Sequence, residues 1–319
     1  FLGSSPYIAP SMYHLMSHLD LEGGVMYPMG GLTQIIQRIE ALAEAQGVTI
    51  LTGSPVTAIN TRDAVVTGVD YTDSSGTART LVADIVVSAA DLHHSETALL
   101  PTVLQTFPQE YWDKRVAGPS ALLIYLGVKG ELPQLEHHTL FFARDWKAGF
   151  DQIFGENPSI PDPASIYVCK PSGIDRSTAP DGHENLFVLV PIPADPTIGK
   201  GDVETLADRV ISQISVWAGI PDLASRVTLR RTLGPGDFES DLNAWRGTAL
   251  GPAHTLAQSA MFRSGNKSRK VEGLFYAGGS TIPGIGLPMC LISAEVMLKR
   301  IRGDRSTEPL VEPLQRTFS

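Results

Sequence analysis

The stretch that decides the fold occupies residues 274–289 and reads LFYAGGSTIPGIGLPM. Its apolar start predicts a strand, its four glycines and two prolines predict a loop, and residues 287–301 predict a helix. Glycines let the backbone adopt positive φ and approach a ligand closely. The helix N-terminus offers unpaired N–H groups and a positive dipole end, which suit a pyrophosphate or the edge of a reduced flavin. The alternative is a tight strand-to-helix turn without a ligand.

Two further blocks precede this motif along the chain. One reads GVMYPMGGL at residues 24–32, and the other reads GTALGPAHTLAQSAMFR at residues 247–263. Together with residues 278–288, they resemble the bacterial-type phytoene desaturase (carotenoid desaturase) family, and the likeness spans Phe1 to about Gly303. Relatives often have His where this chain has Ile282, and Pro where it has Ser264. Neither departure removes a glycine, so substrate choice is affected more than cofactor binding.

The resemblance implies FAD as the cofactor, held largely by the final motif. Val56, after a Gly-Ser-Pro turn, would hold adenine through its backbone, and the alternative is a core valine. We expect the backbone N–H groups at Leu287 to Met289 to face the flavin pyrimidine edge, with Pro288 fitting the first turn of the helix. The predicted cofactor-binding residues are Val56, Gly278, Gly279, Ser280, Gly286, Leu287, Pro288 and Met289.

The other two blocks supply candidates for the substrate side. Gly30 and Gly31 would allow close approach to flavin or substrate, or else cap the following helix. His254 and Gln258 are four residues apart and would share one helix face. Arg263 would hold a ring, a quinone or a developing charge, or else pair with a carboxylate. The candidates are Tyr27, Gly30, Gly31, His254, Gln258 and Arg263, and the sequence identifies no catalytic base.

No Gly-x-Gly-x-x-Gly turn occurs anywhere in the chain. Flavoenzymes of this group use such a turn, between a strand and a helix, to cradle the ADP moiety. We interpret the chain as the C-terminal portion of a longer desaturase. The alternatives are a subunit completed by a complementary N-terminal chain and a cofactor-free remnant.

Composition describes an ordinary folded protein. The chain has 319 residues, 43% hydrophobic and 18% charged, with a net charge of −9 that argues against a nucleic-acid partner. No apolar run reaches the roughly 18 residues of a membrane-spanning helix. Cys169 and Cys290 form no disulfide or zinc pattern and fit a reducing cytoplasm.

Periodicity predicts an α/β protein of the two-domain FAD-dependent oxidoreductase kind. Helices are predicted at residues 31–46 and 203–217, and strands at residues 48–51, 65–71, 79–88, 122–128, 165–169 and 186–192. The last part of the 79–88 strand lacks alternation, which suggests burial on both faces. We assign residues 24–91 and 251–303 to a partial FAD-binding domain, residues 1–23 and 92–250 to a mixed-sheet substrate domain, and residues 304–319 to a mobile tail.

Histidine pairs do not indicate a metal site. His14 and His18 have helical spacing, and His93 and His94 lie near Glu96, but neither pair has a Cys or an acidic triad nearby in sequence. His137 and His138 are predicted to lie in a loop. Cys290, inside the last helix, is expected to be a small buried residue rather than a reactive thiol. We therefore expect no bound metal.

The resemblance implies FAD-dependent desaturation of a linear polyisoprenoid such as phytoene, in carotenoid biosynthesis. A quinone or oxygen would reoxidise the flavin, and the protein would be cytoplasmic and peripheral to the membrane. The alternatives are a carotenoid isomerase or ketolase, an amine oxidase-like flavoenzyme, and a fragment or subunit that needs a partner chain. An amine oxidase would place an aromatic pair beside the flavin, and Trp245 and Tyr276 are the candidates for that pair.

Overall fold

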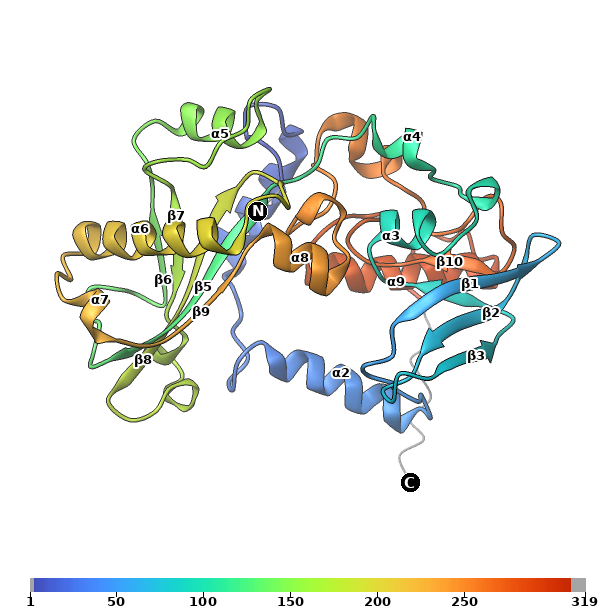
Figure 1. Ribbon diagram of the computed structural model, residues 1–319, viewed down its shortest axis with the longest axis horizontal. Coiled ribbons are helices and arrows are strands. Elements are labelled where there is room, and N and C mark those ends of the chain that lie inside the picture. The colour runs from blue at the N-terminus through green and yellow to red at the C-terminus, as the bar shows by residue number, and fades with distance from the viewer. Residues whose placement is uncertain (1–2, 311–319) are drawn as a thin grey trace.

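The computed structural model describes residues 3–310, which form two groups of elements (Figure 1). The first group is built on a five-stranded antiparallel sheet of order β6-β7-β8-β5-β9. Helix α6 (Lys200–Ala218) lies along one face of this sheet. The strands are β5 (Ser120–Lys129), β6 (His138–Phe141), β7 (Ile166–Cys169), β8 (His183–Ile192) and β9 (Val227–Leu233).

Strict alternation along β8 explains how this sheet builds a core. Every second residue from Glu184 to Ile192 is buried, and the residues between them are half-buried. Because successive side chains point to opposite faces, one face of the sheet is sealed and the other is accessible. The sealed face packs on α6 through a shared cluster that includes Leu122, Ile124, Val188, Val190, Leu206, Val210 and Ile214.

The second group holds two smaller sheets. Strands β1 (Val56–Arg62), β2 (Val65–Thr72) and β3 (Ala78–Val82) form an antiparallel meander. Strands β4 (Val86–Ser88) and β10 (Leu274–Tyr276) pair in parallel, and β10 is followed by the glycine loop and helix α9 (Leu287–Arg302). The remaining α-helices are α1 (His14–His18), α2 (Thr33–Ala45), α3 (Leu92–Thr97), α4 (Gln109–Trp112), α5 (Trp146–Phe154), α7 (Leu223–Arg226) and α8 (Pro235–Leu242).

The main predicted elements are present, and two strand predictions are wrong. Residues 48–51 form no strand, because no described strand lies beside them to complete a hydrogen-bond ladder, and Val48, Ile50 and Leu51 are exposed. The predicted strand at residues 79–88 is divided into β3 and β4. Strand β4 is also not buried on both faces, since Val87 is 39% exposed.

Each group of elements has a hydrophobic cluster of its own. The second cluster joins Val66 of β2, Leu92 of α3, Trp112 of α4 and Leu274 of β10, and it also includes Trp245. Residues 92–112 therefore pack with the proposed flavin-side elements, although the sequence assigned them to the substrate domain. The boundaries at residues 24–91, 92–250 and 251–303 stay a prediction.

Two amphipathic helices of the second group keep their apolar sides accessible. On α2, Ile36 and Leu42 are more than half exposed, and none of its residues is buried. On α9, only Ser293 and Lys299 are buried, while Leu291 is 53% exposed. Helix periodicity in these segments therefore marks a surface that the described residues do not cover.

The structure describes the first part of the predicted tail, residues 304–310. Lys299 donates hydrogen bonds to the carbonyl oxygens of Ser306 and Glu308, and the Leu310 N–H donates to Glu295 at 2.8 Å. Residues 304–310 thus pack back onto α9. The rest of the predicted mobile tail, residues 311–319, lies outside the described residues.

Candidate functional site

The glycine loop between β10 and α9 has the backbone geometry that its sequence predicts. Gly278, Gly284 and Gly286 have φ of 105°, 146° and 108°, which L side chains rarely adopt. Gly286 is the N-cap residue of α9, and Pro288 stands in the first turn of the helix. The loop therefore delivers the positive end of the α9 dipole at its outer surface.

A buried asparagine fixes the shape of this loop. Asn266 Nδ2 lies 3.2 Å from the Tyr276 carbonyl oxygen and 3.0 Å from Ser293 Oγ on α9. Ser293 Oγ also accepts from the Gly278 N–H at 3.0 Å and contacts Thr281 Oγ1 at 2.8 Å. One amide thus joins the end of β10, the loop and the helix. The sequence analysis missed this residue, whose only signal was a polar side chain in a short segment before β10.

Arg263 supports the same loop from below. Its guanidinium is buried and donates to the carbonyl oxygens of Gly279 at 2.5 Å and Thr281 at 3.2 Å. Burial lowers the pKa of Arg263 to about 10, so the side chain is still charged at neutral pH. The alternative prediction, that Arg263 pairs with a carboxylate, is wrong, since backbone carbonyls accept the hydrogen bonds of the guanidinium. Arg263 is thus placed to position the loop.

His254 and Gln258 are both buried but do not share a helix face. His254 precedes a 3₁₀ turn at Leu256–Gln258, so the four-residue spacing does not have α-helical geometry. A Cβ added at Gly284 would lie 2.8 Å from His254 Nε2. Gln258 Oε1 accepts from the Val116 N–H at 2.8 Å, and Gln258 Nε2 donates to the Val116 carbonyl oxygen at 2.9 Å. These residues therefore form the floor beneath the loop.

Two glycines of the loop are not crowded by neighbouring atoms. A Cβ added at Gly278 would meet nothing closer than 3.6 Å, and one at Gly286 nothing closer than 4.0 Å, which are ordinary van der Waals distances. The positive φ of these residues, rather than crowding, therefore favours glycine there. The first turn of α9 adds N–H groups that have no acceptor within the helix. This combination fits the edge of a flavin.

A carboxylate and a phenol below the loop were not predicted. Glu96 is fully buried and accepts a hydrogen bond from the Phe107 N–H at 2.7 Å and another from the Tyr276 hydroxyl. Burial raises the pKa of both side chains. Tyr276 is therefore a core residue, as is Trp245, which packs on Trp112. Neither forms the aromatic pair of an amine oxidase.

The first glycine block lies at a different place. Gly30 donates its N–H to Asp175 Oδ2 at 2.5 Å, and the Gly31 N–H donates to the Pro28 carbonyl oxygen at 3.0 Å. Helix α2 begins at Thr33 with Leu32 as its N-cap residue, so neither glycine caps it. The block thus contacts the end of the five-stranded sheet and is not brought to the loop.

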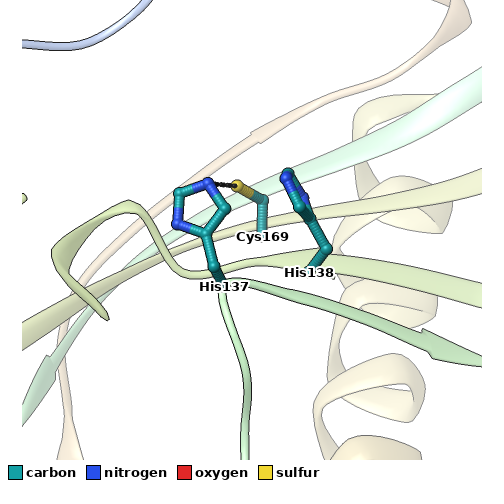
Figure 2. A group of neighbouring side chains, drawn as sticks. All are labelled: His137, His138 and Cys169. Carbon is teal, nitrogen blue, oxygen red and sulfur yellow. Dashed lines mark hydrogen bonds between the residues drawn. The ribbon is translucent and has the colours of Figure 1, made fainter. Parts of the chain in front are cut away.

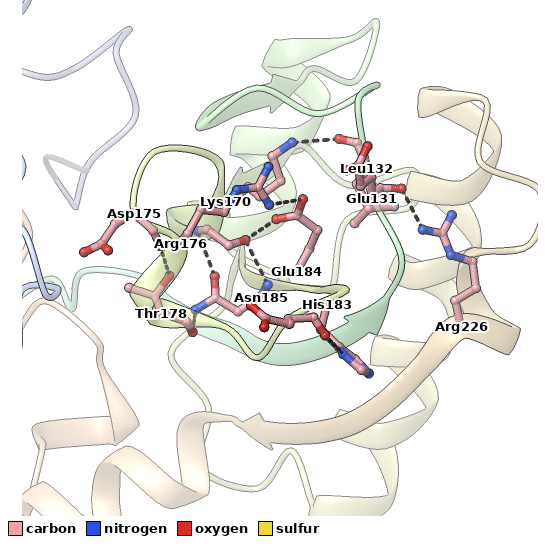
Figure 3. A network of polar contacts seen from close by, with 12 residues as sticks. Glu131, Leu132, Lys170, Asp175, Arg176, Thr178, His183, Glu184, Asn185 and Arg226 are labelled. Carbon is pink, nitrogen blue, oxygen red and sulfur yellow. Dashed lines mark hydrogen bonds and ion pairs between the residues drawn. The ribbon is translucent and has the colours of Figure 1, made fainter.

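Polar contacts hold Asp175 in place (Figure 3). Buried Glu184 accepts from Arg176 Nη1 at 3.0 Å and from the Ser172 hydroxyl. Asn185 Nδ2 donates to the Thr178 carbonyl oxygen at 2.9 Å. The turn that presents Asp175 to Gly30 is therefore anchored on β8.

Val56 and the histidine pair complete the predicted residues. Val56 starts β1 and is 38% exposed, so it is not a core valine. His138 is the first residue of β6 and His137 immediately precedes it, so the predicted loop is wrong for His138 (Figure 2). Cys290 is half-buried, and burial raises the pKa of its thiol, which agrees with an unreactive residue.

Comparison with known proteins gives the family. The model of flavin-containing amine oxidoreductases matches residues 1–295, and the chain belongs to that family. Carotenoid 3,4-desaturase from Haloarcula japonica is 41% identical over 98% of this chain and 60% of its own length. The zeta-carotene-forming phytoene desaturase from Myxococcus xanthus is 34% identical over 94% of this chain and 57% of its own length. The chain spans about three-fifths of these relatives.

Solved structures agree on the fold. An oxidoreductase from Methanosarcina mazei matches with a TM-score of 0.57 and 17% identity, over 91% of this chain and 58% of that one. Together with the family match, this shows the FAD-dependent oxidoreductase fold and a flavin as the cofactor. Within residues 3–310, no helix is long and apolar enough to cross a membrane.

Proposed function

We propose that this chain forms the flavin-side and substrate-side parts of an FAD-dependent desaturase that acts on a long linear polyene, as in carotenoid biosynthesis. The observation that carries the proposal is the glycine loop before α9, in which Gly278, Gly284 and Gly286 have positive φ and Gly286 is the N-cap residue of the helix. Similarity to enzymes named carotenoid 3,4-desaturase and phytoene desaturase supports a polyene rather than an amine substrate. The carotenoid isomerase or ketolase and the amine oxidase are less favoured alternatives.

A bound flavin would supply the redox chemistry, which is acceptance of a hydride from a saturated carbon next to the polyene; the proton of the neighbouring carbon would pass to a base that the sequence does not identify. The chain's own contribution lies in positioning. The Gly279 and Thr281 carbonyls are held by Arg263, which fixes the loop against which the ring edge would lie. The N–H groups at Leu287 and Met289 would stabilise negative charge at that edge, an effect of about 0.3–2 kcal/mol. Val56 would contact adenine through its backbone.

The accessible face of the five-stranded sheet offers a surface for the polyene. Tyr125 pairs with Phe187 across β5 and β8, and their ring centres are 5.4 Å apart. The Tyr167 ring lies 6.3 Å from that of Phe187, and Leu123 pairs with Leu189. Half-buried aromatic and apolar side chains on one sheet face suit a rigid apolar chain. We place the polyene along this face.

Expression in a bacterial host that accumulates phytoene tests the proposal. The chain is produced alone and together with a segment equivalent to the part of the relatives that it does not span, and carotenoids are separated by chromatography. A product with a longer conjugated system is expected when flavin is bound, with a quinone or oxygen as the acceptor. Flavin-loaded protein that leaves phytoene, zeta-carotene and 3,4-saturated carotenoids unchanged would contradict the proposed activity.

A second arm separates flavin binding from activity. Replacement of Gly286 by Val adds a β-branched side chain at φ 108° and next to the proposed position of the ring, so flavin retention should be lost. Flavin absorbance of the purified protein measures this directly. Full retention in Gly286→Val would mean that the flavin does not lie against this loop and would favour the plain strand-to-helix turn.

Membrane contact is a further part of the proposal. Tyr7, Leu15, Leu21 and Met26 are each more than 60% exposed, and all lie within the first 30 residues. Such a segment can contact lipid without spanning it. Liposome flotation with neutral and anionic lipid tests this, and no flotation with either would contradict it.

A further inference from the structure

A cluster of two imidazoles and a thiol lies at the β6 edge of the five-stranded sheet (Figure 2). His138 on β6 stands directly opposite Cys169 on β7 in the strand register, and His137 immediately precedes His138. One potential ligand atom from each residue lies within 4.8 Å of the others. His137 Nε2 is 3.9 Å from Cys169 Sγ. Backbone pairing thus brings together three side chains that are 32 residues apart at most.

The spacing and chemistry of these atoms match a borderline-soft cation. We propose that His137, His138 and Cys169 form a binding site for one divalent transition-metal ion, with Zn²⁺ as the expected occupant. Zinc–nitrogen and zinc–sulfur bonds of about 2.0–2.3 Å in a tetrahedron separate ligand atoms by about 3.5 Å. The ligand atoms must therefore approach one another by about 1.3 Å at most, which side-chain rotation can supply. Imidazole and thiolate are the ligands that zinc prefers among protein groups.

Neighbouring residues provide a second observation that points to a ligand. The hydroxyl of Tyr27 and Nδ1 of His137 are both buried, and neither has a hydrogen-bond partner among residues 3–310. The two rings meet edge to face with their centres 5.2 Å apart. Buried polar atoms are rarely left unpaired. A cation with its bound water at this point would give the Tyr27 hydroxyl a partner.

The surroundings orient the imidazoles for binding. His138 Nδ1 lies 2.8 Å from the Tyr167 hydroxyl, a contact that would fix the ring and leave its other nitrogen available. Metal binding must also displace the proton of the Cys169 thiol.

The site would have a structural consequence. Tyr27 belongs to the segment that leads into α2, and its neighbour Gly30 is held by Asp175 on the same side of the sheet. An ion at His137, His138 and Cys169 would add a second attachment of this segment to the sheet. Metal binding should therefore raise the unfolding temperature of the protein.

Titration of the purified chain with Co²⁺ tests the proposal, because tetrahedral Co²⁺ reports thiolate ligation through a charge-transfer band. We expect one Co²⁺ per chain, a thiolate band, and loss of that band when Zn²⁺ is added. Cys169→Ser should abolish the band, and His137→Gln and His138→Gln should each weaken binding by at least about tenfold. Cys290→Ser and His183→Gln are the matched controls and should bind like the unchanged protein.

X-ray absorption of the Zn²⁺-loaded protein gives a readout that needs no variant. One sulfur and two imidazole nitrogens around the metal are expected. A first shell without sulfur would overturn the site. No cobalt band in the unchanged protein, or a band that survives Cys169→Ser and disappears in Cys290→Ser, would also overturn it.

Discussion

The five-stranded sheet region and the glycine-loop region are stabilised in different ways. The sheet region has a continuous apolar core in which Leu122, Ile124, Val188 and Val190 are completely buried. The loop region depends on polar side chains, such as Asn266 and Arg263, that hold backbone carbonyls. In the same group of elements, α2 and α9 leave apolar residues exposed. One region is therefore shaped by packing, and the other by hydrogen bonds that keep a binding surface open.

The difference teaches where tolerance to substitution should lie. Packed cores lose stability when a methylene is removed, because the space is not refilled. Hydrogen-bonded loops lose stability when a buried partner is left alone. Apolar residues on an exposed helix surface fill no core space and leave no buried polar partner, so their substitution should change stability little. The two regions can thus be separated experimentally by pairs of matched substitutions.

The largest effect is expected in the sheet core. Leu122→Ala removes a side chain with 0% exposure and should cost about 2–5 kcal/mol of unfolding free energy. The matched change Ile36→Ala on α2, where the side chain is 56% exposed, should cost less than about 0.5 kcal/mol. Urea unfolding followed by circular dichroism measures both. Equal losses would show that α2 is covered in solution and would break the comparison.

The next effect concerns the floor of the loop. Gly284→Ala places a methyl group 2.8 Å from His254 Nε2 at a residue with φ of 146°, so strain and clash together should cost about 3 kcal/mol. Gly265→Ala is the control, because no atom lies within 4 Å of its added Cβ. Adding His254→Ala should relieve only the clash. A Gly284→Ala protein as stable as Gly265→Ala would show that the loop is not fixed as described.

A smaller loss is expected from the hydrogen-bond network. Asn266→Ala removes the donor to the Tyr276 carbonyl and to Ser293, and should cost about 2 kcal/mol. Asn60, whose amide contacts Asp70 at 2.8 Å on the β1–β2 meander, is the matched position. Asn60→Ala should cost less than about 1 kcal/mol. If flavin retention falls in Asn266→Ala while Asn60→Ala keeps it, the network shapes the cofactor surface.

The sequence predicted the helices and strands whose periodicity is strong. Helices α2, α6 and α9 and strands β5, β7 and β8 lie close to the predicted ranges. The glycine loop was also predicted, because glycines and prolines at those spacings leave few backbone alternatives. Strands β1, β6 and β9 were not predicted, since their apolar alternation is weak and pairing with distant neighbours defines them.

The site was only partly predictable for a related reason. Asn266, Ser293 and Glu96 act through partners far along the chain, and a single polar residue carries no signal of such a partner. Residues 48–51 have strand propensity, but the described chain offers no neighbour to pair with them. The cluster of His137, His138 and Cys169 likewise depends on the β6–β7 register, which their spacing in sequence does not reveal.

The smallest effect is a pH dependence in the buried pair below the loop. Burial raises the pKa of Glu96 above its ordinary value of 4.5, so the protonated side chain contributes stability that is complete below that value. This contribution is lost as pH rises through the folded-state pKa. Glu96→Gln cannot titrate, so the unchanged protein should lose stability relative to this variant as pH rises above 4.5.

Tyr276→Phe sharpens this test of the pair. The Tyr276 hydroxyl donates a hydrogen bond that lowers the pKa of Glu96 against the larger effect of burial. Without this donor the folded-state pKa of Glu96 rises further, so the loss of stability should continue to higher pH and be larger in total than in the unchanged protein. Unfolding midpoints of the unchanged protein, Glu96→Gln and Tyr276→Phe across this range provide the measurement. Stability that rises with pH relative to Glu96→Gln would mean that Glu96 is ionised in the fold, and that charge rather than a neutral hydrogen bond joins α3 to β10.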